Sequence, residues 1–184
     1  MSFTVHKDVM VAMRDGVELA TDLWVPDATP APTLLVRLPY SKDLPALLGY
    51  GLVPNLFALV EAGYTVVYQD CRGTFRSAGE FTPMLTEADD GADTVAWVLE
   101  QPWCDGSIGT YGPSYLGFVQ WASVTASGRV RAIAPCVTTT PRRGTPTAAP
   151  CPGTRSSRGP PRWRWPRRCA SSAGARATRS CWPT

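Results

Sequence analysis

Hydrophobic and polar residues alternate along two segments near the start of the chain, residues 9–13 and 17–23. A period of two is typical of β-strands that bury one face. The dipeptide Asp15-Gly16 between them tolerates the positive backbone φ angles that tight hairpin turns need. The pattern therefore predicts an N-terminal β-hairpin.

The alternation then gives way to short runs that are mostly apolar, as is typical of strands buried on both faces of a sheet. These runs cover residues 33–37, 64–69, 107–111 and 130–134. Apolar residues at helical spacing predict helices between them, over residues 54–62, 86–99 and 115–126. Strands that alternate with helices in this way predict an α/β fold, in which a mostly parallel sheet carries helices on both faces.

The middle helix is expected to begin with an acidic cluster, because Glu87, Asp89 and Asp90 follow Thr86. Thr86 with Asp89 three positions later resembles a capping arrangement, and acidic side chains favour the positive end of the helix dipole. We interpret the cluster as a helix cap with a solvated face rather than as a metal site.

A serine stands in the turn between the third apolar run and the helix that follows it. The segment reads Gly112-Pro113-Ser114-Tyr115-Leu116-Gly117. A serine between small residues at a strand-to-helix turn is how α/β-hydrolases expose a nucleophile, since glycine lets strand and helix approach closely. Ser114 is therefore a candidate nucleophile. The second glycine comes one position later than in the strict G-x-S-x-G motif, so an ordinary turn is the alternative.

The composition divides the chain into two unlike parts. All 15 acidic residues and 8 of the 18 basic ones lie in residues 1–140, a net charge of −7, whereas residues 141–184 hold 10 arginines and no acidic residue. From residue 138 onward, 47 consecutive residues come from only eight types: Ser, Pro, Thr, Ala, Cys, Trp, Arg and Gly. At average amino-acid usage, such a run has a probability of roughly 10⁻¹⁵.

A reading frame shifted by one base explains this restricted alphabet. Each of the eight types has a codon with C or G at its second position, and GC-rich genes carry C or G at nearly every third position. We therefore predict a truncated domain over residues 1–137, followed by a disordered Arg/Pro-rich frameshift product over residues 138–184. The alternative is a disordered basic tail that binds nucleic acid through its arginines and through Trp163 and Trp165.

The sequence holds little that could bind a metal ion or direct the protein to a membrane. His6 is the only histidine, and the six cysteines show no C-x-x-C or Cys/His spacing, so we expect no metal site and no cofactor. The N-terminus lacks the basic and apolar regions of a signal peptide, and no apolar run is long enough for a membrane span. These features predict a cytoplasmic protein with reduced thiols.

Several motifs together resemble the X-Pro dipeptidyl-peptidase and cocaine-esterase family of α/β-hydrolases, often labelled CocE/NonD hydrolases. In this family the nucleophile turn has the pattern G-x-S-Y-x-G, which matches residues 112–117. Further pieces follow the family's order and spacing, and they cover residues 13–23, 37–40, 63–73, 77–81 and 101–106. The resemblance spans residues 3–135.

The resemblance implies a serine hydrolase that cleaves small esters, amides or X-Pro peptides through an acyl-enzyme. Ser114 matches the family's nucleophile, and the backbone N–H of Tyr115 and the hydroxyl of Tyr40 match its oxyanion hole. Without the resemblance, the alternative for Tyr40 is a buried tyrosine bonded to the backbone. Asp70 and Arg72 are interpreted as a structural pair that shapes the loop beneath the site.

The other two catalytic groups of such an enzyme have no candidate in this chain. A serine hydroxyl needs a base and a carboxylate that orients the base, and in α/β-hydrolases the chain order is serine, acid, histidine. No histidine follows Ser114, and no Asp or Glu follows Asp105. His6 lies in the predicted first strand, which the family's triad does not use. We therefore predict that the chain as given is inactive. The alternatives are a binding module without turnover and a nucleic-acid-binding protein.

Overall fold

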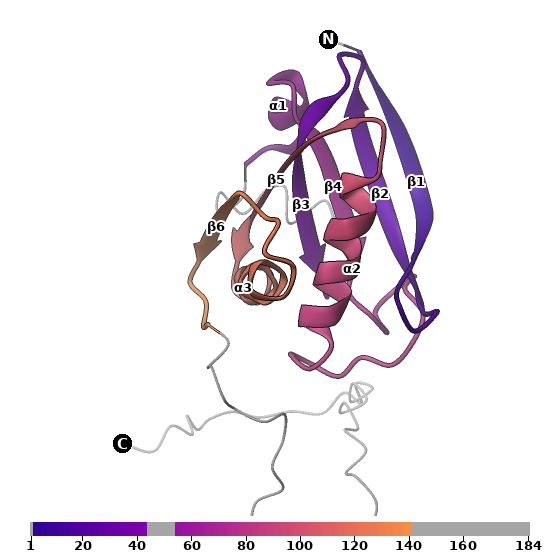
Figure 1. The fold of residues 1–184 in the computed structure, drawn as a ribbon, viewed down its shortest axis with the longest axis vertical. Helices are drawn as coiled ribbons and strands as arrows, with labels where there is room; N and C mark the ends of the chain where they lie inside the picture. Colours follow the sequence, from indigo (N-terminus) through magenta and orange to yellow (C-terminus); the bar gives the residue numbers. More distant parts are fainter. Residues whose placement is uncertain (1, 44–53, 141–184) are drawn as a thin grey trace, which may run out of the picture. The chain divides into compact units, whose positions relative to one another are not determined.

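Six β-strands form one mixed sheet in the computed structural model, which describes residues 2–43 and 54–140 of the chain (Figure 1). The strands are β1 (Phe3–Ala12), β2 (Glu18–Pro26), β3 (Ala31–Leu38), β4 (Thr65–Asp70), β5 (Cys104–Pro113) and β6 (Ala132–Cys136). The helices are α1 (Leu56–Glu61), α2 (Glu87–Leu99) and α3 (Tyr115–Ser127). The predicted tail lies outside the described residues from residue 141 onward.

The order of the strands across the sheet is β1-β2-β4-β3-β5-β6. β2 pairs antiparallel with both β1 and β4, whereas β4, β3, β5 and β6 run parallel to one another. The predicted α/β fold, with an N-terminal hairpin and a mostly parallel sheet, is confirmed. None of the helices in residues 2–43 and 54–140 is long and apolar enough to cross a membrane.

The first strand begins at Phe3, whereas the alternating pattern begins only at residue 9. The register between β1 and β2 shifts between His6 and Val9, where Asp8 adopts a positive φ of 55°. Such a bulge inserts an extra residue and turns the following side chains to the opposite face. The alternation is therefore broken at the bulge, and only its second half was visible as a strand pattern.

Two hydrophobic clusters cover opposite faces of the sheet, because neighbouring residues of a strand point to opposite sides. On β4, Val66 packs in the same cluster as Val60 of α1, whereas the next residue, Val67, packs with Val95 of α2. Burying each such side chain contributes roughly 1.5–3 kcal/mol to folding. The helices therefore cover both faces, as predicted, with α2 and α3 in front of the sheet in Figure 1.

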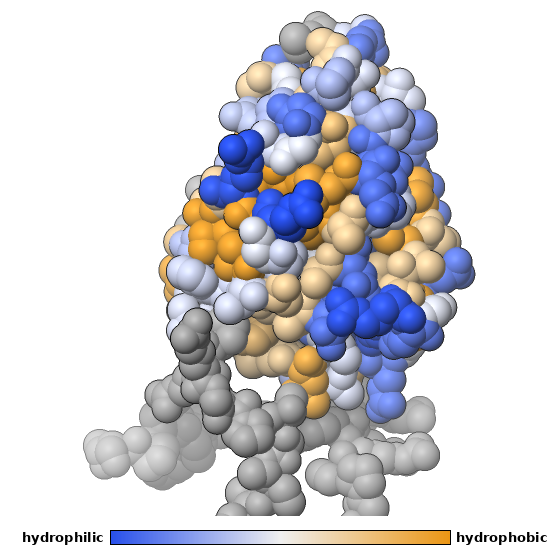
Figure 2. Space-filling view, viewed as in Figure 1, coloured by the Kyte–Doolittle hydropathy of each residue, from blue (hydrophilic) through white to orange (hydrophobic). Residues whose placement is uncertain are grey.

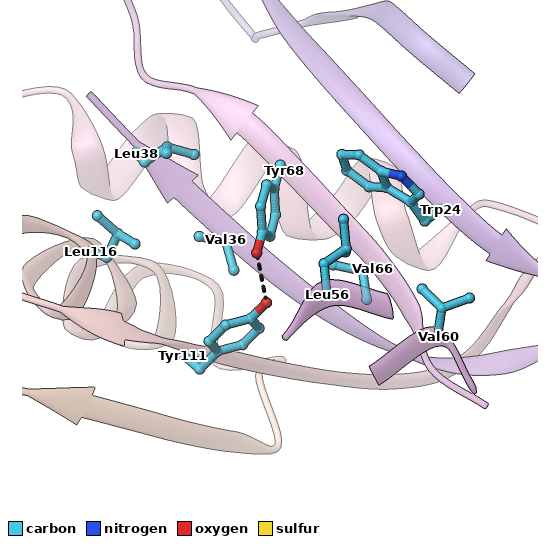
Figure 3. Packing of buried hydrophobic residues seen from close by; sticks show 9 residues of the cluster. All are labelled: Trp24, Val36, Leu38, Leu56, Val60, Val66, Tyr68, Tyr111 and Leu116. Carbon is cyan, nitrogen blue, oxygen red and sulfur yellow. Dashed lines mark hydrogen bonds between the residues drawn. The ribbon is translucent and has the colours of Figure 1, made fainter. Parts of the chain in front are cut away.

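The first cluster also contains a pair of tyrosines from the two strands on either side of β3 (Figure 3). The hydroxyl groups of Tyr68 on β4 and Tyr111 on β5 point toward each other, with 3.0 Å between their oxygens. Each hydroxyl thus has a partner in an otherwise apolar region, where an unpaired one would be costly.

The far edge of the described sheet is formed by β6, which pairs with β5 on its inner side only. Val137, directly after this strand, is 81% exposed. On the face shown in Figure 2, hydrophobic residues gather on the side where α3 and β6 lie. An open strand edge next to apolar surface is where further chain can add to a sheet.

Candidate active site

Three parallel strands end at the same edge of the sheet, and each carries a candidate site residue at its end or shortly after it. Tyr40 comes shortly after β3, Asp70 is the last residue of β4, and Ser114 follows β5 directly. Binding and catalytic sites of open α/β sheets lie at this carboxyl edge. The structure therefore brings these three positions to the same edge, as the strand predictions required.

Ser114 occupies a sharp turn between β5 and α3, with φ 57° and ψ −123°. Its N–H donates to the carbonyl of Cys136 on β6 (2.9 Å), and its carbonyl accepts from the N–H groups of Gly117 (3.0 Å) and Phe118 (3.2 Å). A non-glycine residue in such a region stores roughly 1–3 kcal/mol of strain, so surrounding contacts must hold it. The three hydrogen bonds hold the backbone while the side chain remains exposed.

At both glycines of the serine turn, a larger residue would collide with a neighbouring side chain. A Cβ on Gly112 (φ 130°) would lie 2.7 Å from Cδ2 of Leu116 in the first turn of α3. A Cβ on Gly117 would lie 2.7 Å from the side chain of Thr138. The second glycine of this turn, one position later than in the strict motif, therefore leaves room for the segment after β6.

Ser114 and Tyr40 line the same pocket, which has a volume of about 470 Å³. The other lining residues come from the loop before α2, from α3 and from the segment after β6, and they are Met84, Tyr115, Phe118, Val137, Thr138 and Thr139. Tyr40 is 43% exposed. The alternative of a buried tyrosine bonded to the backbone is therefore wrong.

The backbone N–H of Tyr115 opens α3, next to Ser114. The first N–H groups of a helix have no acceptor within the helix, so this donor is available to a ligand in the pocket. The side chain of Tyr115 is held elsewhere. Its hydroxyl donates to Oε1 of Glu87 (2.8 Å) and accepts from the N–H of Met84 (2.9 Å). Burial and the neighbouring Glu87 carboxylate hold the pKa of Tyr115 well above its usual value.

The acidic start of α2 is buried, in contrast to the predicted solvated face. Glu87 and Asp90 are each 1% exposed, and the side chain of Thr86 makes no capping hydrogen bond. Oε2 of Glu87 lies 3.0 Å from Nη1 of Arg37, a buried arginine on β3. The predicted cap with a solvated face is therefore wrong for these two carboxylates. Only Asp89 of the cluster lies on the surface.

Asp70 and Arg72 do not pair with each other, so the prediction of a structural pair is wrong as well. Oδ1 of Asp70 accepts from the N–H of Lys42 (2.7 Å), and burial raises the pKa of this carboxyl. Arg72 instead binds Asp90 (2.5 Å) and Asp15 in the β1–β2 turn (2.7 Å). Each residue therefore ties the loop after β4 to a different part of the fold.

His6 lies on β1, opposite Leu23 of β2. Four strand spacings separate β1 from β5 in the sheet, a distance of about 19 Å at the usual spacing of neighbouring strands. His6 is therefore too far from Ser114 to accept its proton. The described residues also contain no group of His, Cys, Asp and Glu arranged to hold a metal ion.

Comparison with solved structures identifies similar folds among hydrolases. A CocE/NonD family hydrolase from Staphylococcus aureus superposes with a TM-score of 0.65 at 28% identity, covering 72% of this chain and 27% of that one. An α-amino acid ester hydrolase superposes with a TM-score of 0.59 at 28% identity, covering 71% of this chain and 24% of that one. The described residues therefore form the N-terminal part of the α/β-hydrolase fold.

Comparison of sequences agrees with the structural likeness. The chain is 50% identical over 137 residues to the cocaine esterase of a Rhodococcus species, a match that covers 73% of this chain and 24% of the esterase. The chain thus spans about a quarter of the length of the curated relatives it matches. A family model described as X-Pro dipeptidyl-peptidase (S15 family) matches residues 15–145. Because this match includes the hairpin turn, the Tyr40 loop and the serine turn, the chain belongs to the X-Pro dipeptidyl-peptidase (S15) family.

Proposed function

We propose that Ser114 is the nucleophile of a serine hydrolase that cleaves ester, amide or X-Pro peptide bonds through an acyl-enzyme. The observation that carries this proposal is the strained backbone of Ser114, which exposes its hydroxyl to the pocket shared with Tyr40. Positive φ angles are uncommon in non-glycine residues and cluster at functional sites. The names of the cocaine esterase and the α-amino acid ester hydrolase, two similar proteins, support ester hydrolysis.

In the proposed reaction, the Ser114 hydroxyl attacks the substrate carbonyl carbon and passes its proton to a base. The carbonyl oxygen becomes an oxyanion, which accepts hydrogen bonds from the N–H of Tyr115 and the hydroxyl of Tyr40. The positive end of the α3 dipole stabilises the same charge. As the intermediate collapses, the base gives its proton to the departing alcohol or amine, and the acyl group stays on Ser114. Water then attacks the acyl carbon, the base transfers a proton from this water to the Ser114 oxygen, and the acid is released.

We further propose that the chain as given is inactive, because it supplies no base to Ser114. The one histidine, His6, lies across the sheet, and no acidic residue follows Asp105. The eight-letter alphabet from residue 138 onward supports a shifted reading frame as the cause. The missing acid and base would then be encoded in the original frame beyond Val137.

The proposal is tested by restoring one base after codon 137 and expressing the resulting product, called here the frame-restored protein. We expect a long reading frame with Leu- and Val-rich segments, an Asp and a His. We also expect hydrolysis of p-nitrophenyl acetate by the frame-restored protein, and only background hydrolysis by the chain as given. A rate above background in the chain as given, lost in Ser114→Ala, would contradict the proposed inactivity.

Replacing Tyr40 with phenylalanine in the frame-restored protein tests the oxyanion role separately. The change removes one hydroxyl donor and keeps the ring, so kcat should fall about 10²–10³-fold. KM should change little, because the hydrogen bond is made mainly to the charged oxygen of the transition state. Tyr64→Phe is the control, since Tyr64 lies outside the pocket. Equal kcat values for the two variants would remove Tyr40 from the oxyanion hole.

A further inference from the structure

A buried lysine lies close to Tyr40 in the loop after β3, and neither the sequence patterns nor the family resemblance singled it out. The side chain of Lys42 is 0% exposed. Its Nζ atom lies 2.6 Å from Oδ1 of Asp8 and 3.0 Å from Oδ1 of Asp22, a carboxylate that is itself fully buried. Lysine is almost never fully buried unless it is paired, so this ion-paired group, called here the lysine cluster, needs a structural or functional reason.

The ammonium of Lys42 stays charged in this environment. Burial lowers the pKa of Lys42, but the hydrogen bonds to Asp8 and Asp22 outweigh that effect and hold it above its usual value. The hydrogen bond from Lys42 lowers the pKa of Asp8 in turn. The lysine cluster is therefore ion-paired at neutral pH, and removing the lysine would leave the buried Asp22 carboxylate paired only with the half-exposed Lys7.

The same residue is held through its backbone. The N–H of Lys42 donates to Oδ1 of Asp70 at the end of β4 (2.7 Å). Ser41, between Lys42 and Tyr40, has a positive φ of 79°. A strained residue persists only where the contacts around it determine its conformation. Lys42, two positions after Tyr40, provides such contacts through its backbone N–H and through its ammonium group.

The bulge in β1 supplies one of the two carboxylates of the lysine cluster. Asp8 is the bulged residue with positive φ, and its N–H donates to Oδ1 of Asp22 (2.9 Å). Bulges re-aim side chains near functional sites. Here the bulge aims the Asp8 carboxylate at Nζ of Lys42. The irregularity of the first strand thus supports a contact to the loop that carries Tyr40.

We infer that Lys42 is a positioning residue whose buried ammonium, held by Asp8 and Asp22, fixes residues 39–43 after β3 and keeps the Tyr40 ring at the Ser114 pocket. The importance of this ring for catalysis rests on the proposed function. The position of the ring is a separate property, which can be measured in the chain as given.

The test uses the chain as given, labelled with 3-fluorotyrosine and studied by ¹⁹F NMR. The resonance that disappears in Tyr40→Phe identifies Tyr40, and the resonances of Tyr68 and Tyr111 report on the core. In Lys42→Met we expect the Tyr40 resonance to move toward the position of free fluorotyrosine while the two core resonances stay in place. Amide exchange at residues 40–43 should become about tenfold faster or more, because local opening becomes easier.

Lys7→Met is the matched control. Lys7 contacts Asp22 and Asp43, as Lys42 does, but it belongs to β1 and its side chain is 46% exposed. This variant removes a positive charge from Asp22 and Asp43 but keeps the buried lysine beside Tyr40, so the Tyr40 resonance should move much less than in Lys42→Met. An unmoved Tyr40 resonance in Lys42→Met, or an equal shift in both variants, would overturn the inference.

Asp8→Asn is a milder variant that keeps the test decisive if Lys42→Met loses the core resonances. Asp8 is partly exposed, and the amide keeps its shape while it loses the charge that attracts Lys42. We expect a smaller shift of Tyr40 in the same direction, with Tyr68 and Tyr111 unchanged. An unmoved Tyr40 resonance with an intact core would again refute the role of the lysine cluster.

Kinetics of the frame-restored protein separate this inference from the proposed function. If both hold, Lys42→Met lowers kcat and has little further effect in the Tyr40→Phe background, since the two changes act through one group. If Tyr40→Phe leaves kcat unchanged, the oxyanion role of Tyr40 fails, while the ¹⁹F result still decides whether Lys42 positions the ring.

Discussion

Replacing Ser114 with alanine in the frame-restored protein is expected to lower kcat for p-nitrophenyl acetate by about 10⁶-fold, as removal of the nucleophile does in serine proteases. In the proposed reaction the oxygen of this hydroxyl forms the bond of the acyl-enzyme, so no neighbouring group can replace it. Alanine keeps the Cβ and the backbone contacts of Ser114 to Cys136, Gly117 and Phe118. The measurement is steady-state hydrolysis, together with the loss of covalent labelling by a fluorophosphonate.

Ser107→Ala provides the control for this result. Ser107 lies on the same strand, β5, and its N–H bonds to Asp105 without using the hydroxyl. The control should keep both the hydrolysis rate and the labelling. Hydrolysis by Ser114→Ala within about tenfold of the parent would show that another residue is the nucleophile.

The second large effect is expected from Arg37→Met, which should destabilise the chain by about 3–5 kcal/mol, since breaking a buried ion pair leaves an uncompensated charge. Arg37 is buried on β3, where its Nη1 contacts both the carboxylate and the carbonyl of Glu87, and its Nε donates to Gln69. Without the guanidinium, the buried Glu87 carboxylate keeps its hydrogen bond from Tyr115 but loses the cation that compensates its charge. Urea unfolding followed by circular dichroism measures the change.

Arg14→Met is the control for Arg37→Met, because Arg14 also binds two carboxylates of α2, Asp89 and Asp93, but is 55% exposed. Exposed ion pairs contribute little to stability, so its unfolding midpoint should stay close to that of the parent. Adding Glu87→Gln to Arg37→Met should recover part of the loss, because the unpaired charge is then removed. Equal midpoints for Arg14→Met and Arg37→Met would contradict a structural role for the buried pair.

Two separate ion-paired groups support the two donors of the proposed oxyanion hole. Arg37 and Glu87 hold the side chain of Tyr115, whose N–H follows Ser114. Lys42 and Asp8, in the lysine cluster, hold the loop of Tyr40. A hydrogen-bond donor stabilises a transition state best when it needs no rearrangement during the reaction. The buried charges therefore serve to fix the two donors before the substrate arrives.

The sequence by itself determined the elements of this fold and the position of its serine turn. Strand and helix periodicities are local, so β3, β4 and α3 followed from short windows of sequence. The turn at Ser114 was equally local, because Gly112 makes room for Leu116 within the same motif. Strand ends were less well determined: β5 runs from Cys104 to Pro113 rather than over residues 107–111, since hydrogen bonding to neighbouring strands extends it beyond the apolar run.

Only the tertiary structure decided which charged residues are buried and which are not. Glu87 and Asp90 have the pattern of an exposed helix start, and their burial depends on Arg37 and Arg72, which come from other strands and loops. Lys42 gave no local signal, because its partners Asp8 and Asp22 belong to the hairpin. A periodic pattern depends only on which face of its own helix or strand each residue occupies. The partner that makes burial of a charge favourable lies far away in sequence, and only the folded chain brings it near.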